Sequence, residues 1–470
     1  MLRAAQATHR SCRLQPSLTG RNGHLATSLD RWSISVSAIR SGTWTNWAGN
    51  QKSTPLRINE PAGESDLADI VARASRAGQT VKAVGAGHSF TSTATTSGHL
   101  ITMGRLNKML DVDRQASTVT VQAGMYISDL NEQLAELGLA MPNLGDIAYQ
   151  TISGAISTST HGTGRNLPGL AAQVSGMRLV TGDGNVLEIN EKENSDLLKF
   201  AAVGVGALGL ISQVTLKVVP AFRLKAIEGA QKLDALIENL DQLVESNDHF
   251  EFFWIPHTKW ALTKTNNRTT EPLQTLSKIK HWYSKTLLEN YAFGAVCTLG
   301  RLRPQMIPRL ATALPSTGQT TTVNDSYRIF SSKRIVKFVE MEYAIPREFC
   351  GEALQRIRQV IETKKYNISF PVEVRFTAKD DLVLSTATAR PTAYIAVHMF
   401  KGMDHTAYFN DVANIMSDYQ GRPHWGKMHS LTHRELSQLY PQWDEFLAVR
   451  DKLDPQRTFA NSYTTQVFGD

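Results

Sequence analysis

The sequence predicts an α+β protein of two domains. Its 470 residues exceed what one hydrophobic core usually supports, so two domains are expected. Between residues 61 and 220, segments of helical and of strand periodicity alternate along the chain. After that point, aromatic-rich strands indicate an antiparallel sheet with helices on one side. We therefore expect an α+β domain at 44–220 and a second domain at 221–470, preceded by an extension at 1–43.

In the first domain, apolar periodicity predicts each element in turn. A helix at 64–77 has Ser65 ahead of its apolar stripe as a cap. The segment 177–189 holds two apolar strands around Thr181-Gly182-Asp183-Gly184, which is a strong hairpin signal. The other expected elements are strand 81–84, strand 117–123, helix 128–137, helix 196–201 and strand 210–219.

The second domain mixes helical segments with aromatic-rich strands. A helix is expected at 232–246, a strand at 250–254 and a polar loop at 268–286. Further strands are expected at 338–343, 372–376 and 393–398.

Composition and charge exclude several classes of protein. Hydrophobic residues at 41% and charged residues at 20% describe an ordinary globular chain. The formal charge is +7, but residues 1–50 hold six arginines and one acid, so the remainder is close to neutral. A nucleic-acid binder is therefore not expected. The most weakly polar stretch, 200–219, contains three glycines and indicates a buried turn and strand, so no membrane span is expected.

The extension and the cysteines bear on the compartment. The first 40 residues are rich in Arg, Ser and Thr and lack an apolar core, which argues against a secretory signal peptide. They resemble an organellar transit peptide, and a disordered extension is the alternative. Cys12, Cys297 and Cys350 have neither disulfide nor metal-ligand spacing, so we expect reduced thiols and no metal. A cytoplasmic protein is expected, or a mitochondrial one if the extension is a transit peptide.

The most informative motif is Val84-Gly85-Ala86-Gly87-His88-Ser89-Phe90. It follows a predicted strand and offers free backbone N–H groups and a hydroxyl, which suits contact with an anionic group. A simple tight turn is the alternative, and a histidine such as His88 is often merely structural.

A second run, residues 151–160, consists of small and hydroxyl-bearing residues and leads into His161-Gly162-Thr163-Gly164. Such a run suits backbone lying along the ribose and diphosphate of a cofactor, and a buried helix is the alternative. A literal GxGxxG also occurs at 204–209, but a helical segment precedes it and a strand follows it. Because the dinucleotide fingerprint has the reverse order, a nicotinamide site is not expected.

Polar residues in the second domain indicate a substrate site. Glu373 and Arg375 lie two apart on one strand and so share a face, where they can hold a polyhydroxylated substrate. A surface ion pair is the alternative, but apolar neighbours favour a partly buried pair. His398 on the next strand could join them. Lys427 is either a solvated lysine or a cation placed beside a reduced cofactor.

Together these motifs resemble the sugar-lactone and alditol oxidases of the vanillyl-alcohol-oxidase-like flavoproteins, above all the L-gulono-1,4-lactone and D-arabinono-1,4-lactone oxidases. The resemblance covers about 44–470. It rests on the motifs around His88 and His161 and on further segments at 143–147, 340–346, 373–376, 422–427, 440–443 and 453–455.

The resemblance implies an FAD-binding domain up to about residue 220, completed by the segment 422–470, and a substrate domain between them. It implies a covalent bond from His88 to the flavin. The residues it places at the cofactor are Val84, Gly85, Ala86, Gly87, His88, Ser89, Phe90, Gly145, Asp146, Thr151, Gly154, Ser157, His161, Ile211 and His424.

The implied reaction is hydride transfer from an alcohol group of a sugar lactone to the flavin. Arg375 and Glu373 would orient the lactone, Lys427 and His424 would stabilise the anionic reduced flavin, and His398 is a further candidate for substrate contact. Gly145 would leave room for oxygen, which favours an oxidase that produces hydrogen peroxide.

Several alternatives stay open. Some members of the family are dehydrogenases that pass electrons to a cytochrome or quinone, and some associate peripherally with membranes. An alditol or xylitol oxidase has the same fold. A flavin carrier without catalysis is a further alternative, against which Glu373, Arg375 and Lys427 weigh.

Overall fold

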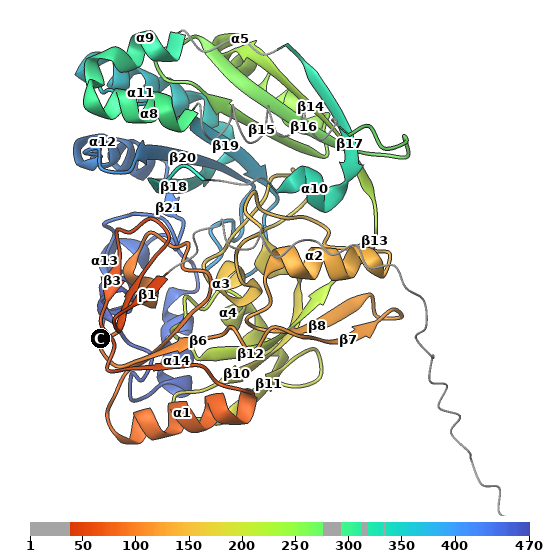
Figure 1. Ribbon diagram of the computed structural model, residues 1–470, viewed down its shortest axis with the longest axis vertical. Coiled ribbons are helices and arrows are strands. Elements are labelled where there is room, and N and C mark those ends of the chain that lie inside the picture. The colour runs from red at the N-terminus through yellow and green to blue at the C-terminus, as the bar shows by residue number, and fades with distance from the viewer. Residues whose placement is uncertain (1–37, 276–292, 313–317, 332–334) are drawn as a thin grey trace, which may run out of the picture. The chain divides into compact units, whose positions relative to one another are not determined.

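A computed structural model describes residues 38–275, 293–312, 318–331 and 335–470, and these described residues belong to one compact unit (Figure 1). The predictions for the extension fall almost entirely outside the described residues, as does the end of the predicted loop at 268–286. The domain boundary near residue 220 stays a prediction.

The first part of the chain builds a five-stranded antiparallel sheet in the order β11-β10-β12-β8-β7. The strands are β7 (Met109–Asp113), β8 (Thr118–Gln122), β10 (Val174–Val180), β11 (Val186–Ile189) and β12 (Leu210–Lys217). Its helices are α1 (Glu64–Arg76), α2 (Ile127–Glu136), α3 (Ile152–Ser157) and α4 (Leu198–Ala201). The hairpin predicted within 177–189 is confirmed, because β10 and β11 pair antiparallel.

A small parallel sheet positions the glycine turn. Its strands are β4 (Arg57–Asn59), β6 (His99–Thr102) and β5 (Val81–Val84), in that order. The predicted strand at 81–84 is confirmed and leads directly into the turn that contains His88. A separate sheet of β1 (Ala38–Arg40), β2 (Thr43–Thr45) and β3 (Lys52–Ser53) precedes it in the chain, and a two-stranded sheet joins β9 (Leu139–Ala140) to β13 (Val219–Pro220).

The second part is an eight-stranded antiparallel sheet in the order β17-β14-β16-β15-β19-β20-β18-β21. The strands are β14 (Arg223–Lys232), β15 (His249–Trp254), β16 (Trp260–Thr269), β17 (Thr320–Asp325), β18 (Phe338–Pro346), β19 (Val372–Thr377), β20 (Thr392–Phe400) and β21 (Arg422–Pro423). The helices are α5 (Leu233–Glu238), α6 (Leu240–Glu245), α8 (Phe293–Leu302), α9 (Ile307–Thr312), α10 (Ser326–Phe330), α11 (Cys350–Lys364), α12 (Thr406–Ser417), α13 (His433–Leu436), α14 (Trp443–Leu453) and α15 (Ser462–Phe468).

One prediction in this region was wrong in detail, and one strand was missed. The helix expected at 232–246 is two helices, α5 and α6, which meet at Asn239. The strand β16 was not predicted, because its polar sequence lacks a clear alternation of apolar residues. It forms nevertheless between β14 and β15, whose hydrogen bonds satisfy it on both sides.

Two hydrophobic cores organise these elements. One joins the five-stranded sheet, α1, α2 and the C-terminal helices α14 and α15. The other joins the apolar face of the eight-stranded sheet to α11 and α12, which lie on one side of it (Figure 1). The opposite face of that sheet is therefore left to polar side chains, and the candidate site lies there.

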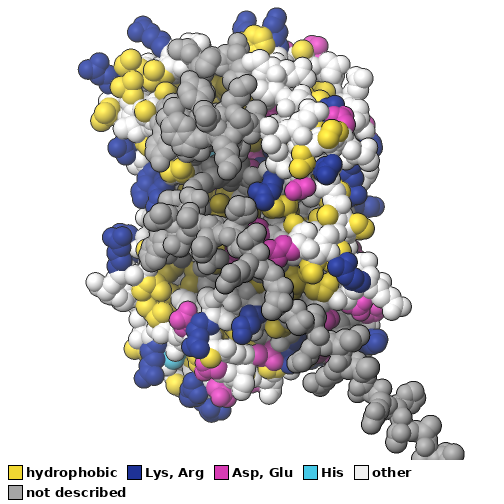
Figure 2. All heavy atoms as spheres, turned by 45° about the vertical axis from the view of Figure 1, so that its right-hand side comes forward, with side chains coloured by type: hydrophobic (Ala, Val, Ile, Leu, Met, Phe, Trp, Pro, Cys, Tyr) yellow, Lys and Arg dark blue, Asp and Glu magenta, His cyan; other side chains and the backbone are white. Residues whose placement is uncertain are grey.

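One face of the surface carries charges of both signs (Figure 2). On this face, basic side chains are dispersed among acidic ones and do not gather into one patch. Among the described residues, no helix combines the length and apolar composition needed to cross a bilayer.

The parallel sheet gives a direct test of the fold around the turn. A Cβ added at Gly98, the residue before β6, would lie 2.1 Å from the backbone oxygen of Thr80. Replacing Gly98 with Ala should therefore destabilise the protein by about 1–3 kcal/mol through overpacking. Gly63→Ala is the matched control, since nothing lies within 4 Å of that position. Equal thermal unfolding midpoints for the two variants would contradict the described backbone.

Candidate active site

The glycine turn lies on a cavity of about 980 Å³, open solvent at its mouth included. Segments far apart in the sequence line it: β5 and the turn, α3, and the loop before β12. Ten of the residues predicted to contact a cofactor line this cavity: Val84, Gly85, Ala86, Gly87, His88, Ser89, Thr151, Gly154, Ser157 and Ile211. The tertiary structure thus brings together two motifs that the sequence showed only as separate runs.

The turn is held by backbone hydrogen bonds from two directions. The Trp47 N–H donates to the Gly87 oxygen at 2.8 Å, and the Phe90 N–H donates to the Gly426 oxygen at 2.7 Å. Gly87 has φ +70°, a conformation that favours glycine. The N-terminal segment and the C-terminal loop therefore both fix the position of His88.

His88 is the clearest orphan group on the cavity wall. Its ring stacks on Trp47 at a centroid distance of 5.3 Å, and its buried Nε2 has no hydrogen-bond partner among the described residues. Burial, followed by the charges of Lys427 and Lys337, lowers the pKa of His88 to about 4. The imidazole is therefore neutral near pH 7 and keeps a nitrogen available to a bound group.

The second run, 151–160, is in part a helix. Residues 152–157 form α3, which buries Ile152, Ala155 and Ile156 in the core. Its other face lines the cavity through Ser153, Gly154 and Ser157. The buried hydroxyl of Thr151 lacks a partner among the described residues. The two interpretations of this run, cofactor contact and buried helix, are thus compatible.

The GxGxxG segment has the order that argues against a nicotinamide site. It follows α4 and precedes β12. Val205 and Gly206 adopt positive φ of 51° and 64°, and both line the cavity. The segment therefore serves as a wall of the same cavity, where close backbone approach is needed.

Lys82 is a cavity residue that the sequence analysis did not single out. Its Nζ donates to the backbone oxygens of Gly206, at 3.0 Å, and Phe459, at 2.8 Å. It therefore ties β5 to the cavity wall and to the C-terminal segment. Burial lowers the pKa of Lys82 to about 7, although the negative charge of Asp454 acts to raise that pKa.

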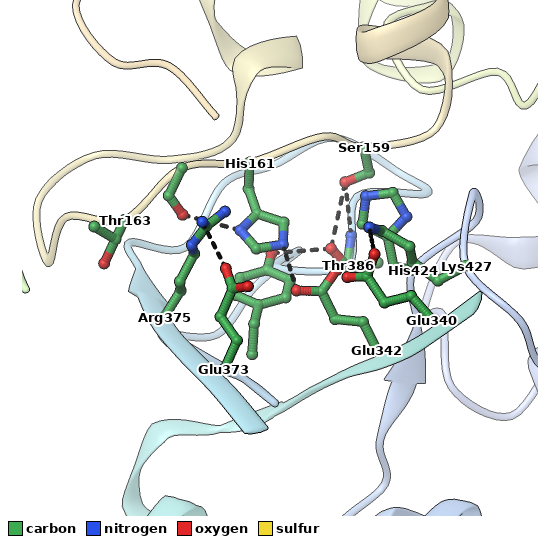
Figure 3. Close-up of polar contacts among 12 residues, drawn as sticks. Ser159, His161, Thr163, Glu340, Glu342, Glu373, Arg375, Thr386, His424 and Lys427 are labelled. Carbon is green, nitrogen blue, oxygen red and sulfur yellow. Dashed lines mark hydrogen bonds and ion pairs between the residues drawn. The ribbon is translucent and has the colours of Figure 1, made fainter. Parts of the chain in front are cut away.

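The second cluster lies on the polar face of the eight-stranded sheet (Figure 3). Side chains alternate between the faces of a strand, so the apolar residues at 372, 374 and 376 leave Glu373 and Arg375 on the other face. The same alternation places the buried Glu340 and Glu342 of β18 on that face. Cross-strand register places Arg375 opposite Glu251 and Tyr394, and Glu340 opposite His398. The cluster therefore follows from strand pairing.

Arg375 is held between two carboxylates. Its Nη2 lies 2.5 Å from Glu373 Oε1, and its Nε donates to Glu251 at 2.9 Å. Lys264 lies 3.4 Å from the other oxygen of Glu251. Burial opposes the charge of Arg375, but the two carboxylates raise its pKa above the usual value. The guanidinium is thus charged, buried and oriented.

His398 and Lys427 meet at Glu340. The Nδ1 of His398 donates to the Pro371 oxygen at 3.1 Å, while its Nε2 lies 3.5 Å from Glu340 and 4.0 Å from Glu373. Lys427 forms an ion pair with the other oxygen of Glu340. Burial would raise the pKa of Glu340, but Lys427 and His398 lower it to about 2.

His161 and His424 flank Glu342. His161 stacks on Tyr394, donates from Nδ1 to the Gly162 oxygen and places Nε2 3.3 Å from Glu342. Burial would raise the pKa of Glu342, but His161 holds it well below its usual value.

The same three side chains have donor atoms within 4.8 Å of one another, which raises the question of a metal. The Nδ1 of His424 accepts from the Gly426 N–H at 3.0 Å, so a neutral ring carries its proton on Nε2. Burial lowers the pKa of His424 to about 3, so the ring is neutral. A protonated Nε2 cannot ligate a metal, and we interpret the group as a hydrogen-bonded carboxylate.

The remaining predicted residues lie outside the cavity lining but beside these clusters. Phe90 lies beneath Lys427, whose Nζ is 5.3 Å from the ring centroid. A Cβ added at Gly145 would lie 3.1 Å from the His161 oxygen, so this glycine packs against the His161 backbone. Asp146 acts electrostatically on both Glu251 and Arg375.

Comparisons with known proteins agree with this arrangement. The family model described as D-arabinono-1,4-lactone oxidase matches residues 214–467, and a model of an FAD binding domain matches 55–190. The chain is 45% identical over 430 residues to L-gulono-1,4-lactone dehydrogenase of Mycobacterium tuberculosis, with 91% of this chain and 100% of that protein covered. It is 34% identical over 442 residues to L-gulonolactone oxidase of Mus musculus, with 92% and 100% covered.

The chain belongs to the D-arabinono-1,4-lactone oxidase family. The predicted fold class and the predicted family are confirmed. The chain is also similar to the crystal structure of cholesterol oxidase from Brevibacterium sterolicum, with a TM-score of 0.78, 14% identity, and 96% and 100% of the two chains covered. At this identity the likeness shows the fold alone.

An FAD-binding domain also fits the cavity itself. The orphan His88 Nε2 and Thr151 hydroxyl are buried polar atoms on its wall, and a bound cofactor would give them partners. FAD is therefore the cofactor of this family member. Sequence reasoning did not single out several residues of the cavity and of the polar cluster: Trp47, Lys82, Glu251, Glu340, Glu342 and Tyr394. For the three glutamates a signal existed, since each alternates with apolar residues along a strand.

Lys82 gives a test of burial at the cavity. Its pKa is about 7 in the folded protein and 10.5 for the ordinary side chain, so the unfolded chain binds more protons between these values. Stability should therefore rise with pH across this window, by on the order of 2 kcal/mol between pH 7 and 9.5. In Lys82→Met the rise should largely disappear, as measured by urea unfolding. Lys364→Met, at an exposed ion pair, should keep it, and an unchanged slope in Lys82→Met would contradict the assignment.

Proposed function

We propose that this protein is an FAD-dependent oxidoreductase that oxidises a sugar-1,4-lactone such as L-gulono-1,4-lactone or D-arabinono-1,4-lactone. The observation that carries the proposal is the buried Glu373–Arg375 pair on the polar face of the sheet. It lies in one cluster with His398 and Lys427, beside the turn that holds His88. The names of the relatives support the substrate class.

Each side chain has a role that its geometry supports. Arg375 presents a fixed fork to the oxygens of the lactone, because Glu373 and Glu251 orient it. Glu373 accepts from a substrate hydroxyl, and His398 lies close enough to receive or relay the proton that the alcohol loses. FAD, when bound, supplies the acceptor for the hydride. Lys427 places a positive charge beside the His88 turn, whereas the neutral His424 adds hydrogen bonding without charge.

A covalent link between His88 and the flavin is part of the proposal. Three observations support it: the ring is neutral, its Nε2 is buried without a partner among the described residues, and it lies on the cavity wall. A neutral imidazole nitrogen is the nucleophilic form. Trp47 and the two backbone hydrogen bonds of the turn keep the ring in place.

We propose oxygen as the electron acceptor, with hydrogen peroxide as product. Gly145 supports this because a glycine at the His161 backbone adds no side chain where oxygen would approach. Relatives are named both oxidase and dehydrogenase, so a cytochrome or quinone acceptor is the alternative. An alditol such as xylitol is the alternative substrate. Peroxide formed per lactone consumed, compared with reduction of an artificial electron acceptor, separates the two acceptors, and a panel of lactones and alditols separates the substrates.

Replacing His88 with Ala should leave the flavin extractable. The variant has no nitrogen for the bond, so flavin should move to the supernatant on acid precipitation, with a lower reduction potential and slower substrate oxidation. His405→Ala, at the start of α12, is the control and should keep flavin in the pellet. Covalent flavin in the His88→Ala variant would show that another residue carries the bond, and extractable flavin in the wild type would remove the covalent link altogether.

Arg375→Lys tests the substrate site. A point charge cannot reproduce the guanidinium fork, so kcat should fall by about 100-fold or more while FAD content stays near that of the wild type. Arg356→Lys, in a surface ion pair with Asp418, is the matched control. Unchanged turnover in Arg375→Lys would place Arg375 outside the site.

A further inference from the structure

Glu340 contacts two of the proposed catalytic residues at once, His398 and Lys427. One of its carboxylate oxygens lies 3.5 Å from His398 Nε2, and the other pairs with the ammonium of Lys427. Its side chain is 7% exposed and that of His398 is also 7% exposed, so water screens these contacts poorly. The carboxylate therefore joins β20, which carries His398, to the C-terminal loop that carries Lys427.

The backbone of the same strand fixes that loop. The backbone N–H of His424 donates to the backbone carbonyl of Glu342 at 3.0 Å, and the backbone N–H of Met428 donates to the backbone carbonyl of Glu340 at 2.9 Å. Lys427 thus stands on a segment anchored at both ends to β18. Its Cα position is set by these bonds, and the direction of its long side chain is set by Glu340.

The charge of Lys427 reaches the cavity. Its Nζ lies 5.3 Å from the Phe90 ring, and its positive charge contributes to the lowered pKa of His88. The contact that fixes the position of the Lys427 ammonium therefore also influences the electrostatic potential at the His88 turn. On the other side, His398 already donates from Nδ1 to Pro371, so its Nε2 is the nitrogen that faces both Glu340 and Glu373.

We propose that Glu340 is a positioning residue for lactone oxidation, which holds the Lys427 ammonium beside the flavin site and orients His398 toward Glu373. This inference rests on the function proposed above. A purely structural ion pair is the competing explanation. Burial of ionised side chains is costly, and such a pair could often be replaced by apolar residues without loss of stability. A positioning role accounts for a carboxylate whose two oxygens are divided between two site residues.

The test is a double-mutant cycle with Glu340→Gln and Lys427→Met. Glutamine keeps the shape of the side chain and removes its charge. If Glu340 acts through Lys427 and His398, kcat for the lactone should fall by about 10- to 100-fold in Glu340→Gln, with a smaller change in KM. The reduction potential of the bound flavin should become more positive, because the charge of Lys427 is no longer balanced. A slower enzyme with a more positive flavin potential is a result that general loosening of the fold does not produce.

The cycle then decides whether the effect runs through Lys427. In the Lys427→Met background, the effect of Glu340→Gln on the flavin potential and on kcat should be much smaller than in the wild type. Glu245→Gln, in an exposed ion pair with Arg165 and Arg347, is the control and should change neither quantity. Additive effects, or wild-type kcat and potential in Glu340→Gln, would overturn the proposal.

Two further outcomes are covered. If Glu340→Gln does not bind FAD, the second variant is Glu340→Asp, which keeps the charge but moves it back by one methylene group. A lowered kcat of Glu340→Asp at normal flavin content supports the proposal. A normal kcat overturns it. If the wild type binds FAD but oxidises no lactone, the proposed function is wrong. The flavin potentials of the four proteins then decide by themselves whether Glu340 sets the charge of Lys427, because that measurement needs no substrate.

Discussion

The site depends on how the C-terminal loop 424–428 is fixed to strand β18. Two backbone hydrogen bonds and the Glu340–Lys427 ion pair hold this loop on the sheet. The Phe90 N–H in turn donates to Gly426, so the loop also supports the turn that contains His88. One short segment thus links the polar face of the second sheet to the cofactor cavity of the first part of the chain. Contacts of His161 with Glu342 and Tyr394, and the Gly164 N–H bond to the Phe376 oxygen, join the same two parts directly.

Charge on the polar face of the sheet is arranged in alternation. Lys264, Glu251, Arg375 and Glu373 follow one another in contact, and Glu340 pairs with Lys427. His398 lies between Glu373 and Glu340. Each buried charge therefore has an opposite neighbour, which is the condition under which ionised groups are tolerated away from water. The same arrangement keeps every side chain in one orientation. It supplies a buried, charged site whose side chains hold one another through ion pairs.

The cavity side of the molecule follows a different principle. There the wall is made of backbone, small residues and hydroxyl groups, and the only strongly perturbed side chains named on it are His88 and Lys82. Burial makes the first a neutral imidazole and lowers the pKa of the second to about 7. An FAD-binding domain that places a large anionic cofactor against backbone N–H groups needs few charged side chains of its own. The two faces of the site are therefore built differently, one of backbone and small residues and one of paired charges, as the proposed function requires.

The sequence by itself determined the fold class, the family, several elements that carry the site, such as β5, β19 and β20, and the residues Glu373, Arg375, His398 and Lys427 as candidates. These follow from local patterns, such as the period-2 alternation that puts Glu373 and Arg375 on one face. It did not predict β16, whose polar sequence becomes a strand only between two partners, or the break at Asn239. Nor did it single out Glu340, Glu251 or Tyr394, because their roles depend on register: each lies directly opposite a site residue on a strand distant in the sequence. Cross-strand pairing and the return of the C-terminal loop are long-range contacts, and only the tertiary structure decides them.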